Sequence, residues 1–322
     1  QMVLGNLSFL VDRWLAKGRP PFVDTKINLI TGAEFATEAT RGTALGPDII
    51  YGWIQGRALE ALAGHLAWLC GPGGQGLPGA PRLRKEVGRF LCTLASSLED
   101  LRSANCGRLH FMMSSTDGAP QQVSAGGSVV PLCDLSETVG FTDIFYTKGL
   151  FAAGMALNDS TLTQEGENGF RRTLEAVLEG HFASDQQPMD PANPVRHLPG
   201  RISHGPLMIS IGGAALLLEH THDHEWWERG LGLVERIVEQ HVCRGRFPQL
   251  HQHDFIEFVT PDGEPYESNG QLICDPGHAL EFVGLTCRLL WVGRDVPGLA
   301  EHVANAERRL LPTLAVILGR AF

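Results

Sequence analysis

The stretch DFIEFVTPDGEPYESNGQLICDPGHALEF, residues 254–282, contains two local structural signals. Its first part, Phe255–Thr260, is rich in β-favouring residues and runs into the turn sequence TPDGEP, which predicts a short hairpin. Its last part begins with Asp275, a good helix N-cap, and Pro276, which suits the first helical position. The apolar residues that follow have helical spacing. We therefore expect a hairpin and then a helix over 276–292.

The same order of elements recurs upstream of this stretch. Residues 108–114 form a second short extended run, and it leads into the turn sequence STDGAP. Apolar residues with a period of 3.6 predict further helices over 2–16, 47–70, 82–104, 137–157, 166–182, 205–219, 226–243 and 298–319. Alternating βαβ order is absent, so we predict an all-α fold, a toroid of helix pairs with short hairpins on one face. We expect one domain over 1–322, and the best alternative boundary is 183–203.

Composition excludes several classes of protein. The 322 residues carry a formal net charge of −10 and no dense Lys/Arg cluster, which argues against a nucleic-acid partner. No apolar run is long enough to span a bilayer, and the first residues lack the pattern of a signal peptide, so we expect a cytoplasmic protein. The seven cysteines include no CxxC pair, so neither disulfides nor a structural zinc site is expected. Cys70, Cys92 and Cys287 are expected in the core.

The helix over 276–292 carries the strongest chemical signal. His278 falls in its first turn, where unpaired backbone N–H groups favour the neutral imidazole that a general base needs. Glu281 lies three residues later on the same face and can accept the other ring N–H of His278. The alternative is a capped helix whose histidine only bonds locally. Spacing alone leaves both interpretations open.

A second signal is WIQGR, residues 53–57. Trp53 and Arg57 lie four apart, and Gly56 between them indicates close approach of another element, because glycine is costly within a helix. An Arg that faces a cavity can hold sugar oxygens or stabilise an enediolate. A surface Arg beside a packing Trp explains the same spacing.

Together these segments resemble the N-acylglucosamine 2-epimerase family, which also contains cellobiose 2-epimerases and mannose isomerases. The matching stretches follow the family's order across most of the chain: WIQGR (53–57), TDIFYTKGLFAAGMAL (142–157), GPLMISIGGAALLLE (205–219), DFIEFVTPDGEPY (254–266) and DPGHALEF (275–282).

The resemblance implies an (α/α)6 barrel that binds an open-chain aldose without cofactor or metal. Family chemistry removes the C2 proton and returns it to the opposite face, or to C1 in the isomerases. His278 and Glu281 would be catalytic. The residues implied to contact the sugar are Arg57, Trp53, Asp143, Tyr146, His204, Met208 and Glu257. A homodimer is compatible with the resemblance.

The chain departs from the family's pattern in two places. A closed barrel needs twelve helices and nine are predicted here, so we expect the C-terminal helices and the family's second acid/base histidine to be missing from this chain. A further histidine marks the cellobiose-epimerase and isomerase branches. Met208 stands at or near its place, as in the N-acylglucosamine branch, and His204 substitutes for it only if its loop bends inward.

Three alternatives to an N-acylhexosamine epimerase remain open. They are an aldose–ketose isomerase of the mannose type, a non-catalytic sugar-binding paralogue, and an (α/α)6 glycoside hydrolase. The last would need Asp143 and Glu257 as its carboxylate pair. The histidines at 220, 222 and 224 have metal-like spacing, but we predict that they lie in a polar connection between helices.

Overall fold

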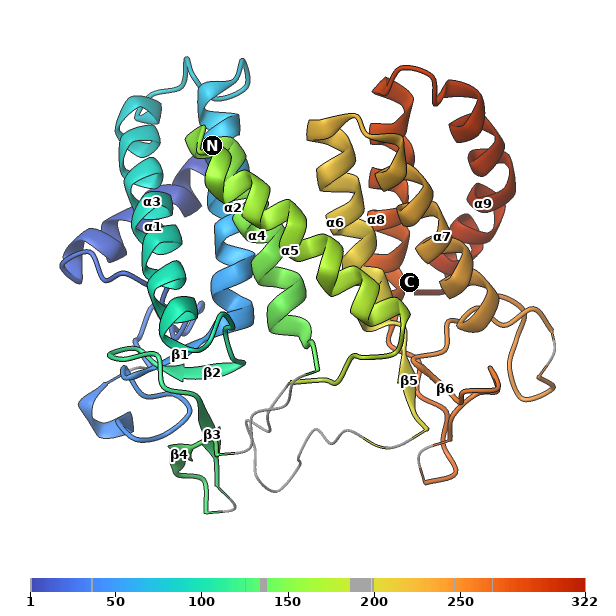
Figure 1. Ribbon diagram of the computed structural model, residues 1–322, viewed down its shortest axis with the longest axis horizontal. Coiled ribbons are helices and arrows are strands. Elements are labelled where there is room, and N and C mark those ends of the chain that lie inside the picture. The colour runs from blue at the N-terminus through green and yellow to red at the C-terminus, as the bar shows by residue number, and fades with distance from the viewer. Residues whose placement is uncertain are drawn as a thin grey trace. The chain divides into compact units, whose positions relative to one another are not determined.

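The computed structural model describes residues 2–35, 37–124, 126–133, 138–185, 198, 200–245, 247–267 and 269–321 (Figure 1). Contacts divide the chain into two compact units, Gln1–Arg196 and His197–Phe322. This division falls within the 183–203 stretch, and residues 186–197 of that stretch lie outside the described residues. The single domain stays a prediction, and each unit is described by itself.

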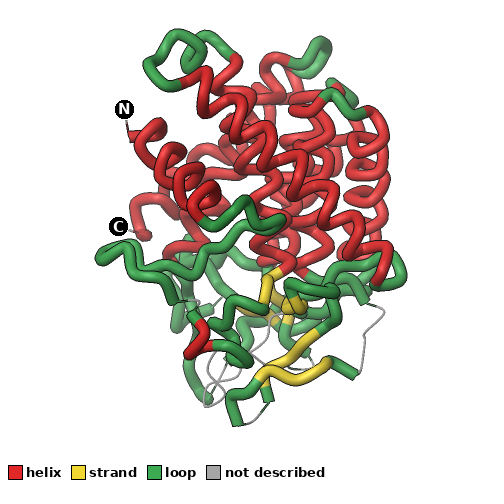
Figure 2. The backbone as a smooth tube through the Cα atoms, turned by 90° about the vertical axis from the view of Figure 1, so that its left-hand side faces the viewer, coloured by secondary structure: helices red, strands yellow, loops and turns green. Residues whose placement is uncertain are grey.

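Long helices dominate the first unit. They are α1 (Met2–Ala16), α2 (Gly52–Cys70), α3 (Ala80–Ala104), α4 (Phe141–Leu157) and α5 (Ser160–Leu178). Helix α2 packs on α3 and α4, and α4 packs on α5. Two short antiparallel pairs lie in the connections between these helices: β1 (Ile49–Tyr51) with β2 (Met112–Ser114), and β3 (Gln121–Val123) with β4 (Val129–Pro131). Figure 2 shows the strands in yellow as brief segments among the loops.

Helices α2 and α4 approach each other through glycines. A Cβ on Gly56 would lie 2.6 Å from the backbone of Phe145, and one on Gly149 would lie 2.2 Å from the carbonyl oxygen of Gly56. Real side chains do not tolerate such contacts with backbone, so both positions need glycine. The element that the sequence placed close to Gly56 is therefore α4.

The second unit contains α6 (Gly205–Thr221), α7 (His224–Gln240), α8 (Pro276–Asp295) and α9 (Ala300–Ala321). Helix α6 packs on α7 and α8, and α8 packs on α9. Strand β5 (Ile202–Ser203) pairs antiparallel with β6 (Phe258–Val259). The core includes the fully buried rings of Trp226 and Phe282.

One order of elements occurs in both units. A strand leads into a helix, a second helix follows, and the next strand returns to pair with the first: β1–α2–α3–β2 and β5–α6–α7–β6. Each second strand then enters a tight turn, closed by Ser114 N–H to the Ala119 carbonyl at 2.9 Å and by Thr260 N–H to the Glu264 carbonyl at 2.8 Å. Both predicted DG hairpins are thus present.

The expected helices are confirmed, with corrections at their ends and surfaces. The helix expected over 47–70 begins only at Gly52, because Ile49–Tyr51 pairs with a strand about sixty residues away in sequence. Placing Cys70, Cys92 and Cys287 in the core was wrong, since all three are exposed on the outer sides of their helices. Within the described ranges, none of the helices combines the length and apolar character that crossing a bilayer requires.

Candidate active site

Glu257 and His204 meet at the end of the β5–β6 pair. The register pairs Ile202 with Val259 and Ser203 with Phe258, so the next positions bring His204 opposite Glu257. Both side chains are buried, with 0% and 6% of their surface exposed. His204 Nε2 lies 3.0 Å from Glu257 Oε2. The loop before α6 therefore turns inward, which is the condition under which His204 was expected to join the site.

His278 reaches the same carboxylate oxygen from the first turn of α8. The side chain of Asp275 caps this helix by accepting from the N–H groups of Gly277 at 2.7 Å and His278 at 3.1 Å. His278 Nδ1 lies 2.9 Å from Glu257 Oε2, so one oxygen accepts from two imidazoles. The side chain of His278 is 43% exposed, and its Nε2 has no hydrogen-bond partner among the described residues.

The two histidines stabilise the charged form of Glu257. Burial alone would raise the pKa of this carboxyl, but the hydrogen bonds from His204 and His278 outweigh burial and lower it to about 2. The bond to Glu257 in turn raises the pKa of His278, against the opposing effect of burial. The expectation that the helix terminus would favour the neutral imidazole is thus corrected. The carboxylate of Glu257 determines the direction in which the pKa of His278 shifts.

Glu257, rather than Glu281, is the carboxylate that hydrogen-bonds His278. Glu281 is exposed and acts on His278 only through its charge, which contributes to the raised pKa. A catalytic role for Glu281 stays a prediction. Met208 is buried one turn into α6, with its N–H 2.9 Å from the His204 carbonyl.

A third histidine, His241, lies behind this network. It follows α7, has no exposed surface, and contacts the ring of His204 edge-on with centroids 5.4 Å apart. The sequence does not predict a role for His241, because no local pattern distinguishes this residue from an ordinary one at a helix end. Glu257 did carry a signal. It is spaced by two residues from Phe255 and from Val259, which are both buried, and this spacing puts its carboxylate on their side of the chain, just before β6.

The corresponding place in the first unit carries no such chemistry. Tyr51 precedes α2 as His204 precedes α6, and it pairs with Met112 in the β1–β2 register. Both side chains are buried in an apolar cluster. The first helix after β2 is α4, just as the first helix after β6 is α8. Helix α4 has Asp143 at its third position, where α8 has His278. Asp143 caps α4 by accepting from Gly140 N–H at 2.8 Å and pairs with Arg108 at 2.7 Å.

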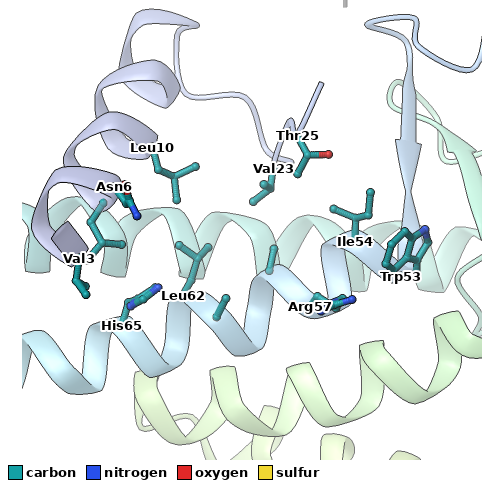
Figure 3. A pocket seen from close by; sticks show the side chains of 13 residues that line it. Val3, Asn6, Leu10, Val23, Thr25, Trp53, Ile54, Arg57, Leu62 and His65 are labelled. Atoms are coloured by element: carbon teal, nitrogen blue, oxygen red, sulfur yellow. The ribbon is translucent and has the colours of Figure 1, made fainter. Parts of the chain in front are cut away.

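The remaining predicted residues lie around α2 and α4. The guanidinium of Arg57 lies over the rings of Trp53 and Phe145, with its carbon 5.8 and 5.2 Å from their centroids, and no carboxylate among the described residues pairs with it. Trp53 and Arg57 also line a cavity of about 550 Å³ between α1 and α2 (Figure 3). Tyr146 is buried, and its hydroxyl has no hydrogen-bond partner in the part of the chain that the structure describes. Contact of these residues with a sugar stays a prediction.

One group of potential metal ligands occurs within the described ranges, formed by His204, Glu257 and His278. In this group, both imidazoles lie at hydrogen-bonding distance from one oxygen of the Glu257 carboxylate. The histidines at 220, 222 and 224 are not part of it. The expected connection between helices holds for His222, whereas His220 lies in the last turn of α6 and His224 is the first residue of α7.

Comparisons with known proteins extend the description of the fold. No family model matches the sequence, and neither does any curated protein. Among solved structures, D-mannose isomerase is similar with a TM-score of 0.54 and 15% identity, over 98% of this chain and 70% of that one. Cellobiose 2-epimerase from Spirochaeta thermophila has a TM-score of 0.49 and 15% identity, over 95% and 70%.

A GH76 α-mannanase from Bacteroides thetaiotaomicron has a TM-score of 0.48 and 8% identity, over 95% of this chain and 70% of that one. At 15% identity the likeness to D-mannose isomerase concerns the fold alone. The chain has the fold of D-mannose isomerase, which confirms the fold class that its resemblance to the N-acylglucosamine 2-epimerase family predicted.

Proposed function

We propose that this protein is a sugar epimerase or isomerase, in which His278 moves the proton at C2 of an open-chain aldose. The observation that carries the proposal is the shared carboxylate oxygen of Glu257, which lies 2.9 Å from His278 Nδ1 and 3.0 Å from His204 Nε2. The fold shared with D-mannose isomerase supports the same class of chemistry.

The geometry divides the roles of the two ring nitrogens of His278. Because Nδ1 faces an ionised carboxylate, it carries the hydrogen and donates to Glu257. The other nitrogen, Nε2, then holds a free lone pair in the neutral ring, and this is the atom that would accept the C2 proton. Glu257 stabilises the imidazolium that results. This raises the pKa of His278 and makes His278 a stronger base.

The proton balance separates the two reactions. Removal of the C2 proton gives an enediolate and the His278 imidazolium. An isomerase returns the proton to C1 while the hydrogen on O2 passes to O1, and so forms a ketose. An epimerase instead needs a donor on the opposite face of C2. The oxyanion formed in either case needs a hydrogen-bond donor.

A glycoside hydrolase is the less favoured assignment. Its general acid must hold a proton at working pH, which requires a carboxyl with a raised pKa. The pKa of Glu257 is instead lowered to about 2, and Asp143 is engaged as a helix cap and ion-pair partner. Neither group has the environment of a glycosidase acid.

Proton NMR in deuterium oxide tests the proposal. The protein is incubated with mannose, glucose, N-acetylmannosamine and N-acetylglucosamine in separate samples. Loss of the C2–H signal of at least one sugar is expected, together with either a ketose or the C2 epimer. The product identifies the reaction, and the reactive sugar identifies the substrate class. Sugar binding without C2–H loss would instead favour a non-catalytic sugar-binding protein.

A further inference from the structure

His241 makes a reciprocal pair of hydrogen bonds with Ile256, the residue immediately before Glu257. The ring Nδ1 of His241 lies 2.9 Å from the Ile256 carbonyl oxygen, and the Ile256 N–H donates to the His241 carbonyl at 2.7 Å. A side chain at the end of α7 thus fixes the backbone directly before Glu257. The N–H of Glu257, which belongs to the same peptide group as the Ile256 carbonyl, donates to the Ile273 carbonyl oxygen at 3.0 Å.

The same ring also bounds His204. The rings of His241 and His204 are 5.4 Å apart at an interplanar angle of 81°, and Phe255 contacts His204 at 4.7 Å. His204 therefore lies between two rings, with its Nε2 directed at Glu257. His241 touches both the backbone that carries the carboxylate and the imidazole that donates to it.

The chemistry of His241 excludes a role as an acid or base toward a sugar. It has no exposed surface, so no substrate reaches it. Because Nδ1 donates to a carbonyl oxygen, Nε2 is unprotonated in the neutral ring. This nitrogen is buried, and no described residue makes a hydrogen bond to it. Burial, followed by the charge of His204, lowers the pKa of His241 to about 4. The ring is neutral at physiological pH.

We propose that His241 is a positioning residue, which holds Ile256 and the ring of His204 and so sets where the Glu257 carboxylate meets His278. The inference rests on the proposed function, since it assigns a role within that acid/base centre. It predicts that the Nδ1–H donor of His241 is the feature that matters, more than the size of its ring.

Two variants separate the donor from the ring. In His241→Asn the side-chain amide takes the place of Nδ1–H and keeps a donor for the Ile256 carbonyl. In His241→Phe the ring remains and the donor is lost. We expect kcat to fall at least tenfold in His241→Phe with KM for the sugar unchanged, and to recover to within about threefold of wild type in His241→Asn. Equal activity of the two variants, or a larger loss in His241→Asn, contradicts the proposal.

Nitrogen-15 NMR of the histidine rings tests the same inference without turnover. In the wild type, His241 is expected in the Nδ1–H tautomer and neutral from pH 6 to 8. The ring N–H groups of His204 and His278 donate to Glu257. Their NMR signals are expected to shift in His241→Phe and to keep their wild-type chemical shifts in His241→Asn. An Nε2–H tautomer, or unchanged signals in both variants, overturns the proposal. If no sugar reacts with the wild type, the proposed function fails, and this NMR result still decides the role of His241.

Discussion

His204 Nε2 lies 3.0 Å from Glu257 Oε2, and this is the same oxygen that accepts from His278 at 2.9 Å. The partly exposed imidazole of His278 is thereby hydrogen-bonded to the buried carboxylate of Glu257, which also accepts a hydrogen bond from the buried imidazole of His204. This arrangement converts an isolated first-turn histidine into the end of a three-residue network.

Removing the charge of Glu257 should disable His278. In Glu257→Gln the hydrogen bond that raises the pKa of His278 loses its ionic partner, so that pKa should fall toward or below the ordinary value. Loss of a supported base costs about 10²- to 10⁴-fold in rate. NMR titration of His278 and the rate of C2–H exchange measure the two effects.

The matched control is Glu281→Gln, which removes the exposed carboxylate that the sequence assigned to the same role. If Glu257 is the hydrogen-bond partner of His278, the pKa of His278 should fall less in Glu281→Gln than in Glu257→Gln. A larger fall of that pKa in Glu281→Gln than in Glu257→Gln would restore the original assignment.

Glu257 should also make the protein sensitive to acid. Its pKa is depressed in the folded state to about 2 from an ordinary value of 4.5, so the folded form binds fewer protons than the unfolded form between these values. Its contribution to stability is fully present above pH 4.5 and is lost as the pH falls toward 2. The upper bound is about 3 kcal/mol, at about 1.4 kcal/mol for each pKa unit.

Urea unfolding of wild type and Glu257→Gln from pH 7 to pH 3 measures this contribution. The difference between the two free energies of unfolding should shrink as the pH is lowered through 4.5. A difference that stays constant over this range contradicts the depressed pKa.

His204 should matter for stability, because it is fully buried and donates a hydrogen bond to the buried carboxylate of Glu257. His204→Leu leaves Glu257 with one donor fewer in a buried place, and this should lower the free energy of unfolding at pH 7 by about 1 to 3 kcal/mol. Denaturant unfolding measures the loss. A loss below about 0.5 kcal/mol would show that the hydrogen bond between His204 and Glu257 is absent in solution.

The contact between α2 and α4 provides a test of the fold. Gly56→Ala forces a Cβ to within 2.6 Å of the Phe145 backbone and should destabilise the protein by about 2 kcal/mol or more. Gly64→Ala is the matched control in α2, since its Cβ would meet nothing within 4 Å, and it should stabilise the protein by about 0.5 to 1 kcal/mol. Thermal unfolding of both variants checks the pair. Tolerance of alanine at Gly56 would contradict the packing.

Helix periodicity predicted most of the fold, because most of the helices bury one apolar stripe that is visible in the local sequence. Helix α6 differs, since all its residues from Gly205 to Leu218 are buried. What the periodicity missed depends on distant partners. Residues Ile49–Tyr51 form a strand only because Met112–Ser114 lies beside them. Local spacing identified His278, but it favoured Glu281 over Glu257, which comes from a different element and reaches His278 through the chain fold. His241 contacts the network only through Ile256 and His204, so it left no local signal.

The most direct test of the central claim compares three proteins under identical conditions. C2–H exchange of the reactive sugar in deuterium oxide is measured for wild type, His278→Ala and His302→Ala. His302 is an exposed histidine of α9 and controls for loss of an imidazole elsewhere in the same unit. We predict exchange in wild type and His302→Ala, and a rate at least 100-fold lower in His278→Ala. Wild-type exchange in His278→Ala would contradict the account.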